Sequence, residues 1–289
     1  MNQSVRAAAV QFSVRSHTLS SLVDHMGGFC REASGWNTNI IVFPEYIIGT
    51  LANRSLNQAP QDQLIQLIEF GDEYQSCLKA LAKKYNLWVL GGTFIERDGN
   101  TGKCFNSAPL VTPDGRIYIQ RKIHLTPWEK SFGFLSAGDQ VLVIDSPFGK
   151  LSTAICYDIE FPDIISKAAA LGCQIVLNPS CTDTLAGYYR VRRCAQARAI
   201  ENQLYVVNAP TVGWYPEVEW LTSNHGRASV VSPCDLGLPA NGMIAQATLD
   251  APDQLIVGDL NLATLNSLKV QGSVTPSLDR RTDFLAKLV

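Results

Sequence analysis

Hydrophobic residues follow two different periods along this chain of 289 residues. Short apolar or alternating runs predict strands, whereas longer stretches with apolar positions three or four residues apart predict helices. Strands are expected at residues 5–12, 39–43, 87–94, 151–155, 174–178, 204–208, 227–232 and 254–260. Helices are expected at residues 20–33, 61–85, 162–171 and 188–201. Strands and helices therefore alternate over much of the chain.

Two turn sequences add antiparallel pairing to this pattern. Asp98-Gly99-Asn100 and Pro113-Asp114-Gly115 separate alternating segments, as hairpin turns do. Hairpins together with segregated helices predict a mixed α+β protein whose helices cover the outer faces of sheets. The sequence has no Pro/Gly/Ser-rich linker, charge run or internal repeat. We therefore expect a single domain over residues 1–289, with a C-terminal tail from about residue 262.

Composition narrows the class of protein further. The chain has 46% hydrophobic and 17% charged residues, and its 24 basic and 26 acidic side chains leave a formal charge of −2. These values are typical of a globular protein and argue against disordered or nucleic-acid-binding chains. No apolar run is long enough to span a membrane, and the first residues lack the layout of a secretion signal. We expect a cytoplasmic protein without nucleic acid or membrane as partners.

The eight cysteines indicate neither a metal site nor a disulfide scaffold. They lie at positions 30, 77, 104, 156, 173, 181, 194 and 234, with no Cys-x-x-Cys pair and no histidine at ligand spacing beside them. Disulfide scaffolds belong mainly to small secreted chains. Most of these cysteines are expected to be small core residues, and no metal is expected.

A first candidate for chemistry is Glu45, at the end of the apolar run over residues 39–43. Pro44 cannot continue a strand, so Glu45 is presented at the carboxyl end, where sheets of this kind place ligands. Burial beside that run would raise the pKa of the carboxyl group and make it a usable base near neutrality. Taken alone, the residue could also be a turn or capping glutamate.

A second candidate is Lys122, which shares a face with His124 if their strand persists through Leu125. A lysine at a strand end is usually a solvated surface charge. Buried beside a carboxylate, it would be a fixed positive charge that can stabilise an oxyanion.

The third candidate is Cys156, between a strand and the helix that Pro162 is well suited to open. A cysteine on such a turn projects its sulfur away from the sheet, as nucleophile elbows do for serine. Its ordinary alternative is another core cysteine. A nucleophile, a base and a cation in three such segments together favour a catalytic site.

These segments resemble one family of enzymes. The order Phe43-Pro44-Glu45, Lys122-Ile123-His124-Leu125 and Ile155-Cys156-Tyr157-Asp158 is similar to that of the nitrilase, or carbon–nitrogen hydrolase, superfamily. The likeness extends from residue 7 to about residue 260, through Pro127-Trp128-Glu129, Asn178-Pro179-Ser180 and residues 197–202. The tail, residues 271–274 and 279–283, resembles a bacterial group sometimes fused to an acetyltransferase domain, which does not fit in this chain.

The resemblance implies a fold and a set of site residues. The fold is a four-layer α-β-β-α sandwich, commonly assembled as homodimers or larger homo-oligomers. The catalytic triad would be Glu45, Lys122 and Cys156, with Glu129 as a second glutamate that helps position the substrate. Residues expected to contact the substrate or the oxyanion are Tyr157, Tyr46, Trp128, Glu160, Ser180 and Cys181.

The implied reaction needs no metal or organic cofactor. Lys122 would favour the thiolate of Cys156, and Glu45 would accept the thiol proton as the sulfur attacks the carbonyl carbon of a small amide. Lys122 and the backbone N–H of Tyr157 would hold the oxyanion. A thioester would form with release of ammonia or an amine, and water would then free the acid.

Several alternatives stay open. Nitriles and N-carbamoyl amides use the same triad, and an amine could replace water as the acyl acceptor. A Cys156–His124 dyad would be a different catalytic arrangement, although it leaves Glu45 unexplained. A catalytically silent binding protein would belong to another class altogether.

Charge near the nucleophile leads to a further hypothesis about selectivity. Asp158, Glu160 and Asp163 near the pocket mouth would repel an acidic substrate and tolerate a neutral or cationic one. The same residues could instead cap the next helix or hold loops. Three arginines could also fold over the site and reverse the local field, namely Arg190, Arg192 and Arg193.

A prediction of homo-oligomers rests mainly on the resemblance. It is weakly supported by a group of apolar residues after the nucleophile, namely Ile164, Ile165, Ala168, Ala169 and Leu171. The same group could be an ordinary buried helix face.

Overall fold

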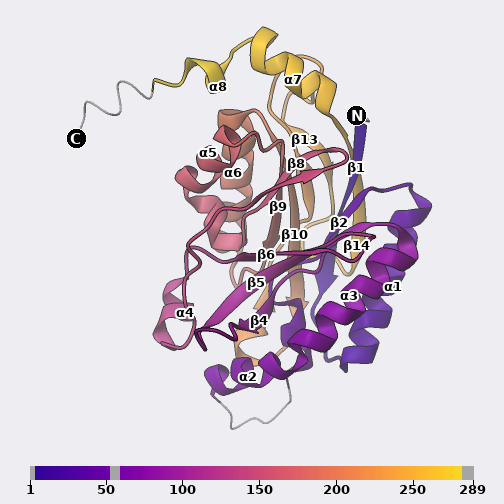
Figure 1. Ribbon diagram of the computed structural model, residues 1–289, viewed down its shortest axis with the longest axis vertical. Helices are drawn as coiled ribbons and strands as arrows, with labels where there is room; N and C mark the ends of the chain where they lie inside the picture. Colours follow the sequence, from indigo (N-terminus) through magenta and orange to yellow (C-terminus); the bar gives the residue numbers. More distant parts are fainter. Residues whose placement is uncertain (1–3, 53–58, 282–289) are drawn as a thin grey trace.

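One curled sheet organises the computed structural model, which describes residues 4–52 and 59–281 (Figure 1). The main path of the sheet runs through β4 (Phe94–Arg97), β5 (Cys104–Val111), β3 (Trp88–Leu90), β2 (Ile40–Val42), β1 (Ser4–Ser13), β10 (Tyr205–Trp214), β9 (Ile175–Ser180), β8 (Gly149–Thr153) and β7 (Val143–Ser146). Further strands pair with this path, namely β6 (Ile117–Arg121), β11 (Ser223–Asn224), β12 (Ser229–Val231) and β14 (Gln254–Asn261), and β13 (Met243–Gln246) pairs with β12.

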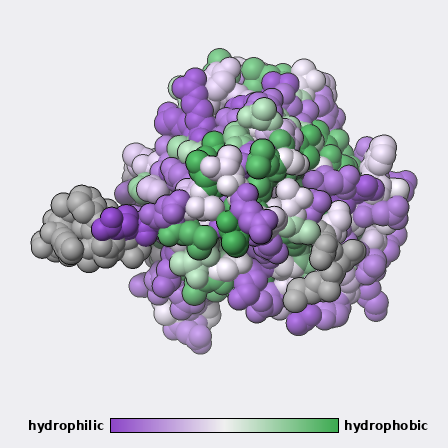
Figure 2. All heavy atoms as spheres, turned by 90° about the horizontal axis from the view of Figure 1, so that it is seen from above, coloured by the Kyte–Doolittle hydropathy of each residue, from purple (hydrophilic) through white to green (hydrophobic). Residues whose placement is uncertain are grey.

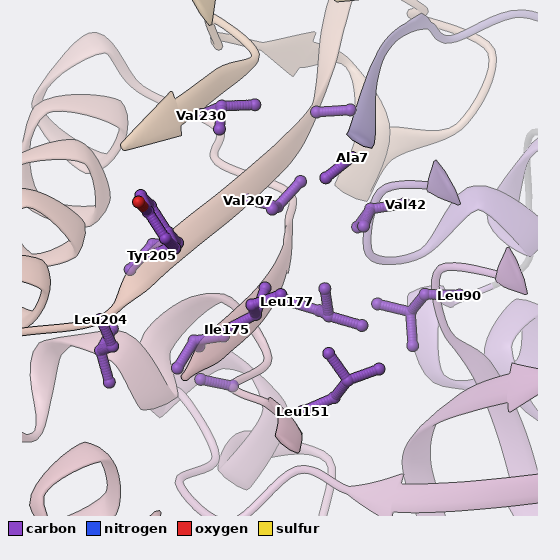
Figure 3. Close-up of a cluster of buried hydrophobic side chains, with 14 of the residues drawn as sticks. Ala7, Val42, Leu90, Leu151, Ile175, Leu177, Leu204, Tyr205, Val207 and Val230 are labelled. Carbon is purple, nitrogen blue, oxygen red and sulfur yellow. The ribbon is translucent and has the colours of Figure 1, made fainter. Parts of the chain in front are cut away.

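The sheet has two halves that meet at the carboxyl end of β1. There β1 pairs with β10 through only two register positions, Phe12 with Thr211 and Ser13 with Val212. The halves then diverge and face each other across a shared apolar interior. Figure 3 shows side chains from both halves gathered there, Val42 and Leu90 from one and Leu151, Ile175, Leu177 and Val207 from the other.

The alternation of side chains along β1 separates two apolar layers. Ala7 and Ala9 belong to the interior between the sheet halves, whereas Ala8 and Val10 pack with α1 (Leu19–Gly35) and α3 (Gly71–Tyr85). This follows from the period of two in a strand that is buried on both faces.

The other sheet half is covered in the same way. The buried faces of α5 (Pro162–Ala170) and α6 (Leu185–Asn202) pack against it, with Ile165, Ala168 and Val191 among their contacts. The expected mixed α+β sandwich of four layers is therefore confirmed, with helices outside and two sheet halves inside (Figure 1).

Two predicted elements are interrupted. The helix expected at residues 61–85 consists of α2 (Pro60–Gln66), a 3₁₀ helix η2 (Leu67–Phe70) and α3. Apolar spacing does not reveal this change, because a 3₁₀ turn keeps side chains three residues apart on one side. The strand expected at residues 87–94 is divided into β3 and β4 by Gly91-Gly92.

The segment expected to be a tail from about residue 262 contains two helices, α7 (Leu262–Gln271) and α8 (Pro276–Asp279). Leu262, Leu265 and Leu268 of α7 are buried, so this helix packs on the body of the protein. The motif at residues 279–283 lies partly outside the described residues. No helix in residues 4–52 and 59–281 is long and apolar enough to cross a membrane.

Candidate active site

A tight turn after β2 positions Glu45, whose side chain is fully buried. The next residue, Tyr46, has a φ of +55° and donates its backbone N–H to Thr93 Oγ1 at 2.8 Å. Thr93 follows Gly92, which has a φ of +68° and lies so close to the carbonyl oxygen of Pro44 that no Cβ would fit. The connection between β3 and β4 therefore holds the turn that presents Glu45.

Cys156 also lies on a strained turn. It follows β8, begins the 3₁₀ helix η3 (Cys156–Glu160) and has a φ of +46°, a conformation that is uncommon outside glycine. Pro162 occupies the first position of α5, as expected. The predicted strand–turn–helix arrangement around Cys156 is present, and backbone strain of this kind clusters at functional sites.

Lys122 is buried immediately after β6. β6 ends at Arg121 and does not persist through Leu125, so the condition under which Lys122 and His124 would share a strand face is not met. The backbone of Lys122 is held on both sides instead. Its N–H donates to the carbonyl of Asn106 at 2.8 Å, and its carbonyl accepts from Gly138 at 2.7 Å.

Glu129 is held by a capping box at the start of α4 (Pro127–Ser131). Its backbone N–H donates to Thr126 Oγ1, and its Oε2 accepts from the backbone N–H and hydroxyl of Thr126 at 2.8 and 3.0 Å. The adjacent Trp128 packs edge-on against the ring of Tyr46, with 6.2 Å between ring centroids. The helix start therefore fixes the carboxylate in a buried position.

The structure brings Glu45, Lys122 and Glu129 into contact. Lys122 Nζ lies 2.8 Å from Glu45 Oε1 and 3.0 and 2.9 Å from the two carboxylate oxygens of Glu129. Tyr46 donates its hydroxyl to Glu129 Oε1 at 2.6 Å. The backbone N–H of Cys181 donates to Glu45 Oε2 at 3.1 Å, and its carbonyl is 3.5 Å from Cys156 Sγ. The backbone of one residue, Cys181, thus contacts both the carboxyl group of Glu45 and the thiol of Cys156.

The two carboxyl groups differ in their tendency to ionise. Burial raises the pKa of Glu45, and the charge of Glu129 adds to this, while Lys122 opposes it. Burial also acts on Glu129, but the charge of Lys122 and the hydrogen bond from Tyr46 outweigh it, so the pKa of Glu129 is lowered. Glu129 is therefore the permanent anion, and Glu45 is the carboxyl group suited to exchange a proton.

Burial raises the pKa of the Cys156 thiol well above its ordinary value, and the neighbouring Glu45 raises it further. Lys122 acts in the opposite direction but does not compensate. Lys122 thus favours the thiolate form of Cys156, whereas burial and Glu45 favour the neutral thiol. The raised pKa means that a base beside the thiol is needed to take its proton as the sulfur reacts.

One contact residue was missed from the sequence. Asn106, in β5, is fully buried, and its Nδ2 lies 3.0 Å from Glu45 Oε1 and 3.0 Å from Glu129 Oε1. The available signal was a polar amide in the alternating segment between the two predicted hairpin turns, where an unpaired amide would be costly if buried.

The remaining expected contact residues are placed differently. Tyr157 packs against the ring of Phe161, with 4.9 Å between centroids. The Ser180 hydroxyl, at the end of β9, accepts from Nδ2 of Asn208 in β10 at 3.1 Å. Glu160 Oε1 is 3.4 Å from Nε of Arg190. These side-chain contacts do not involve Glu45, Lys122 or Glu129.

His124 is engaged away from the thiol. Its Nδ1 is 3.3 Å from Asp158 Oδ1, and its ring stacks on Phe161 with 3.6 Å between centroids. Within residues 4–52 and 59–281, the hydrogen bond recorded for Cys156 Sγ is to the Cys181 carbonyl. The geometry therefore gives the Cys156–His124 dyad no support.

Asp158 does not lie at a pocket mouth, which corrects one part of the charge hypothesis. It is buried and accepts hydrogen bonds from the backbone N–H groups of Ile123, His124 and Ile155. Its carboxylate thus ties the segment after Lys122 to the turn that carries Cys156. Asp163 is exposed in the first turn of α5.

The three arginines considered above have partners on or near α6. Arg190 faces Glu160, Arg192 donates to the Tyr188 hydroxyl and to Gln246, and Arg193 lies over the Tyr189 ring. All eight cysteines are free. In the part of the chain that the structure describes, no group of three His, Cys, Asp or Glu side chains could hold a metal ion.

The sequence is similar to a known protein family and to several of its members. The model of the carbon–nitrogen hydrolase family matches residues 6–269. The probable hydrolase YhcX of Bacillus subtilis is 34% identical over 97% of this chain, which spans 54% of that relative's length. The omega-amidase NIT2 of Danio rerio is 26% identical, with 94% of each chain covered.

The fold has close structural counterparts. The carbon–nitrogen hydrolase from Helicobacter pylori G27 superposes with a TM-score of 0.83 and 21% sequence identity, covering 99% of this chain and 98% of that one. At this level of identity the likeness establishes the shared fold.

Proposed function

The chain belongs to the carbon–nitrogen hydrolase family, and on that premise we propose that it hydrolyses a small amide through a thioester on Cys156. The observation that carries the proposal is a buried ammonium shared by two carboxyl groups of opposite pKa shift, next to a thiol on a strained turn. Paired carboxyl groups with divergent pKa values are typical of acid–base chemistry.

In the first half of the reaction, Glu45 removes the thiol proton while Cys156 Sγ attacks the amide carbonyl carbon. The Lys122 ammonium and the backbone N–H of Tyr157 stabilise the oxyanion that forms. Collapse of this intermediate breaks the C–N bond, and the proton held by Glu45 passes to the leaving nitrogen. Ammonia or an amine departs, and the acyl group stays on the sulfur.

In the second half, the ionised Glu45 accepts a proton from water as its oxygen attacks the thioester. The C–S bond then breaks, the acid is released, and the proton returns to the sulfur through Glu45. Glu129 remains ionised throughout and keeps Lys122 in place. An amine that replaces water would yield a new amide through the same thioester.

We propose a neutral or amine-bearing amide as the substrate. The likeness to the omega-amidase NIT2 supports an amide substrate. Glu160 and Asp163 still add negative charge in the segment after the nucleophile. Asp158 no longer contributes to this argument, and Arg190 offsets Glu160 in part. The proposal on charge therefore rests on fewer groups than the sequence indicated.

A substrate panel tests both parts of this proposal. Ammonia release should be fastest for small aliphatic amides, and kcat/KM for an amino-acid amide should exceed that for the matching N-carbamoyl amino acid. A tenfold advantage for the carboxylated substrate, about 1.4 kcal/mol of transition-state binding, would contradict the charge argument. Turnover of nitriles alone would contradict amide hydrolysis, and no covalent or catalytic reaction at all would indicate a silent binding protein.

We also propose that residues 1–289 act as one catalytic domain that forms homo-oligomers. Ile164, Ile165 and Ala168 are buried in the core, so they no longer support assembly. Exposed apolar side chains remain on α6, among them Tyr189 and Ile200, and Leu171 is exposed directly after α5. Figure 2 shows further hydrophobic surface between hydrophilic groups at the end of the molecule where α7 lies.

Light scattering at micromolar concentration should give a mass of at least two chains, because burying these apolar side chains against a second copy is favourable. An exposed polar replacement, Ile200→Lys, should weaken that assembly if α6 takes part. A wild-type monomer at the same concentration would refute the assembly proposal.

A further inference from the structure

Asn106 occupies an unusual position in the middle of β5, a strand whose residues are all buried. Its side-chain nitrogen is 3.0 Å from an oxygen of Glu45 and 3.0 Å from an oxygen of Glu129. A primary amide carries two N–H donors, so one nitrogen can serve both carboxyl groups at the same time. Among the described residues, Lys122 and Asn106 are the side chains that donate hydrogen bonds to both glutamates.

The orientation of this amide follows from its surroundings. A flipped amide would place Oδ1 against two carboxylate oxygens, where it would repel both. In the observed orientation, Oδ1 of Asn106 is buried and has no hydrogen-bond partner. An unsatisfied buried acceptor destabilises a fold and calls for an explanation. The two hydrogen bonds from Nδ2 to the glutamates provide one.

The contacts of Glu45 indicate what the amide does. Its Oε1 accepts from both Lys122 and Asn106, whereas its Oε2 accepts from the backbone N–H of Cys181. The carbonyl of the same Cys181 faces the thiol of Cys156. With Oε1 fixed by two donors, Oε2 is held at the backbone of Cys181, the residue whose carbonyl contacts the nucleophile.

Charge balance makes a second donor necessary. Two ionised carboxylates and one ammonium leave a net negative charge in a buried site, and repulsion between the carboxylates favours a proton on one of them. A neutral amide that donates to both reduces this repulsion without adding a charge.

We infer that Asn106 is a positioning residue that holds Glu45 and Glu129 side by side in their ionised forms, with Glu45 directed toward Cys156. This inference rests on the proposed function, because it assigns Asn106 to the base of that reaction. Asn106 acts through the glutamates and does not contact the reacting atoms. The burial that raises the pKa of Glu45 makes this support important near neutral pH.

The test is the pH dependence of kcat and KM for Asn106→Leu, which has a similar volume and no donor. We expect kcat to fall by about tenfold or more and KM to change by less than about threefold. The acid limb of kcat/KM should move upward by about half a pH unit or more, because Glu45 takes a proton more readily without the amide. A structural role alone would lower stability without moving this limb.

Two further variants make the result decisive. Asn202→Leu removes another buried amide, which bonds to the Arg198 carbonyl on α6, and it should lower stability with an unshifted acid limb. Asn106→Ser keeps one hydroxyl donor, so the acid limb of its kcat/KM should move upward by less than that of Asn106→Leu. If Asn106→Leu does not fold, the acid limb of Asn106→Ser alone tests the inference. An unshifted limb in the Asn106 variants, or an equal shift in Asn202→Leu, would overturn the inference. Failure of the proposed function is seen separately, as a wild-type protein without amidase activity.

Discussion

Replacing Cys156 by alanine is expected to lower kcat/KM for the preferred amide by about 10³-fold or more. Without the sulfur no thioester can form, and neither Glu45 nor Lys122 can replace it as a nucleophile. The fold should persist, because the change removes one buried sulfur atom at the end of a strand and costs about 1 kcal/mol. Steady-state ammonia release together with thermal unfolding measures both quantities.

The matched control for this experiment is His124→Ala. His124 stacks on Phe161 and pairs with Asp158, so its loss should reduce activity much less than loss of Cys156 or Glu45. Retention of more than about one hundredth of the wild-type rate in Cys156→Ala would remove Cys156 as the nucleophile. A His124 variant as impaired as Cys156→Ala, beside an active Glu45 variant, would favour the dyad.

The sequence allowed three of the clustered side chains to be located because local signals mark strand ends. Pro44 ends the strand before Glu45, and Pro162 begins the helix after Cys156. Parallel strands bring their carboxyl ends to one edge, so residues far apart in the chain meet there. Lys122 lies immediately after its strand and not within it, because β6 ends at Arg121.

Other features depend on contacts between distant segments and have no local signal. Asn106 lies inside a strand, and only the fold shows that two carboxyl groups reach it from β2 and α4. Asp158 looked like a charge at the pocket mouth, but backbone N–H groups after Lys122 turn it inward. The raised pKa of the Cys156 thiol also comes from burial and from the neighbouring Glu45, which only the fold brings together.

Replacing Glu45 by glutamine should strongly lower activity but leave the protein folded. Glutamine cannot accept the thiol proton, so kcat/KM should fall by about 10³-fold. The fold should tolerate the change, since one ammonium and one carboxylate then remain in the buried cluster and balance each other.

By contrast, Lys122→Met leaves two buried carboxylates without their cation and should lower the free energy of unfolding by about 3–5 kcal/mol.

The sign of the pH dependence follows from the raised pKa of Glu45. Because the ionised form is the base, wild-type kcat/KM should fall as the pH decreases through a value above that of an ordinary glutamate. The stability of the folded protein has the opposite pH dependence. Above the ordinary pKa the unfolded state has already released this proton, so the folded wild type loses stability as pH rises through the raised pKa. Glu45→Gln lacks this titration, and its stability relative to wild type should therefore increase from acidic to neutral pH. Denaturant unfolding of both proteins over that range measures the difference, and a relative stability that decreases with pH would show that the Glu45 carboxyl group is not held with a raised pKa.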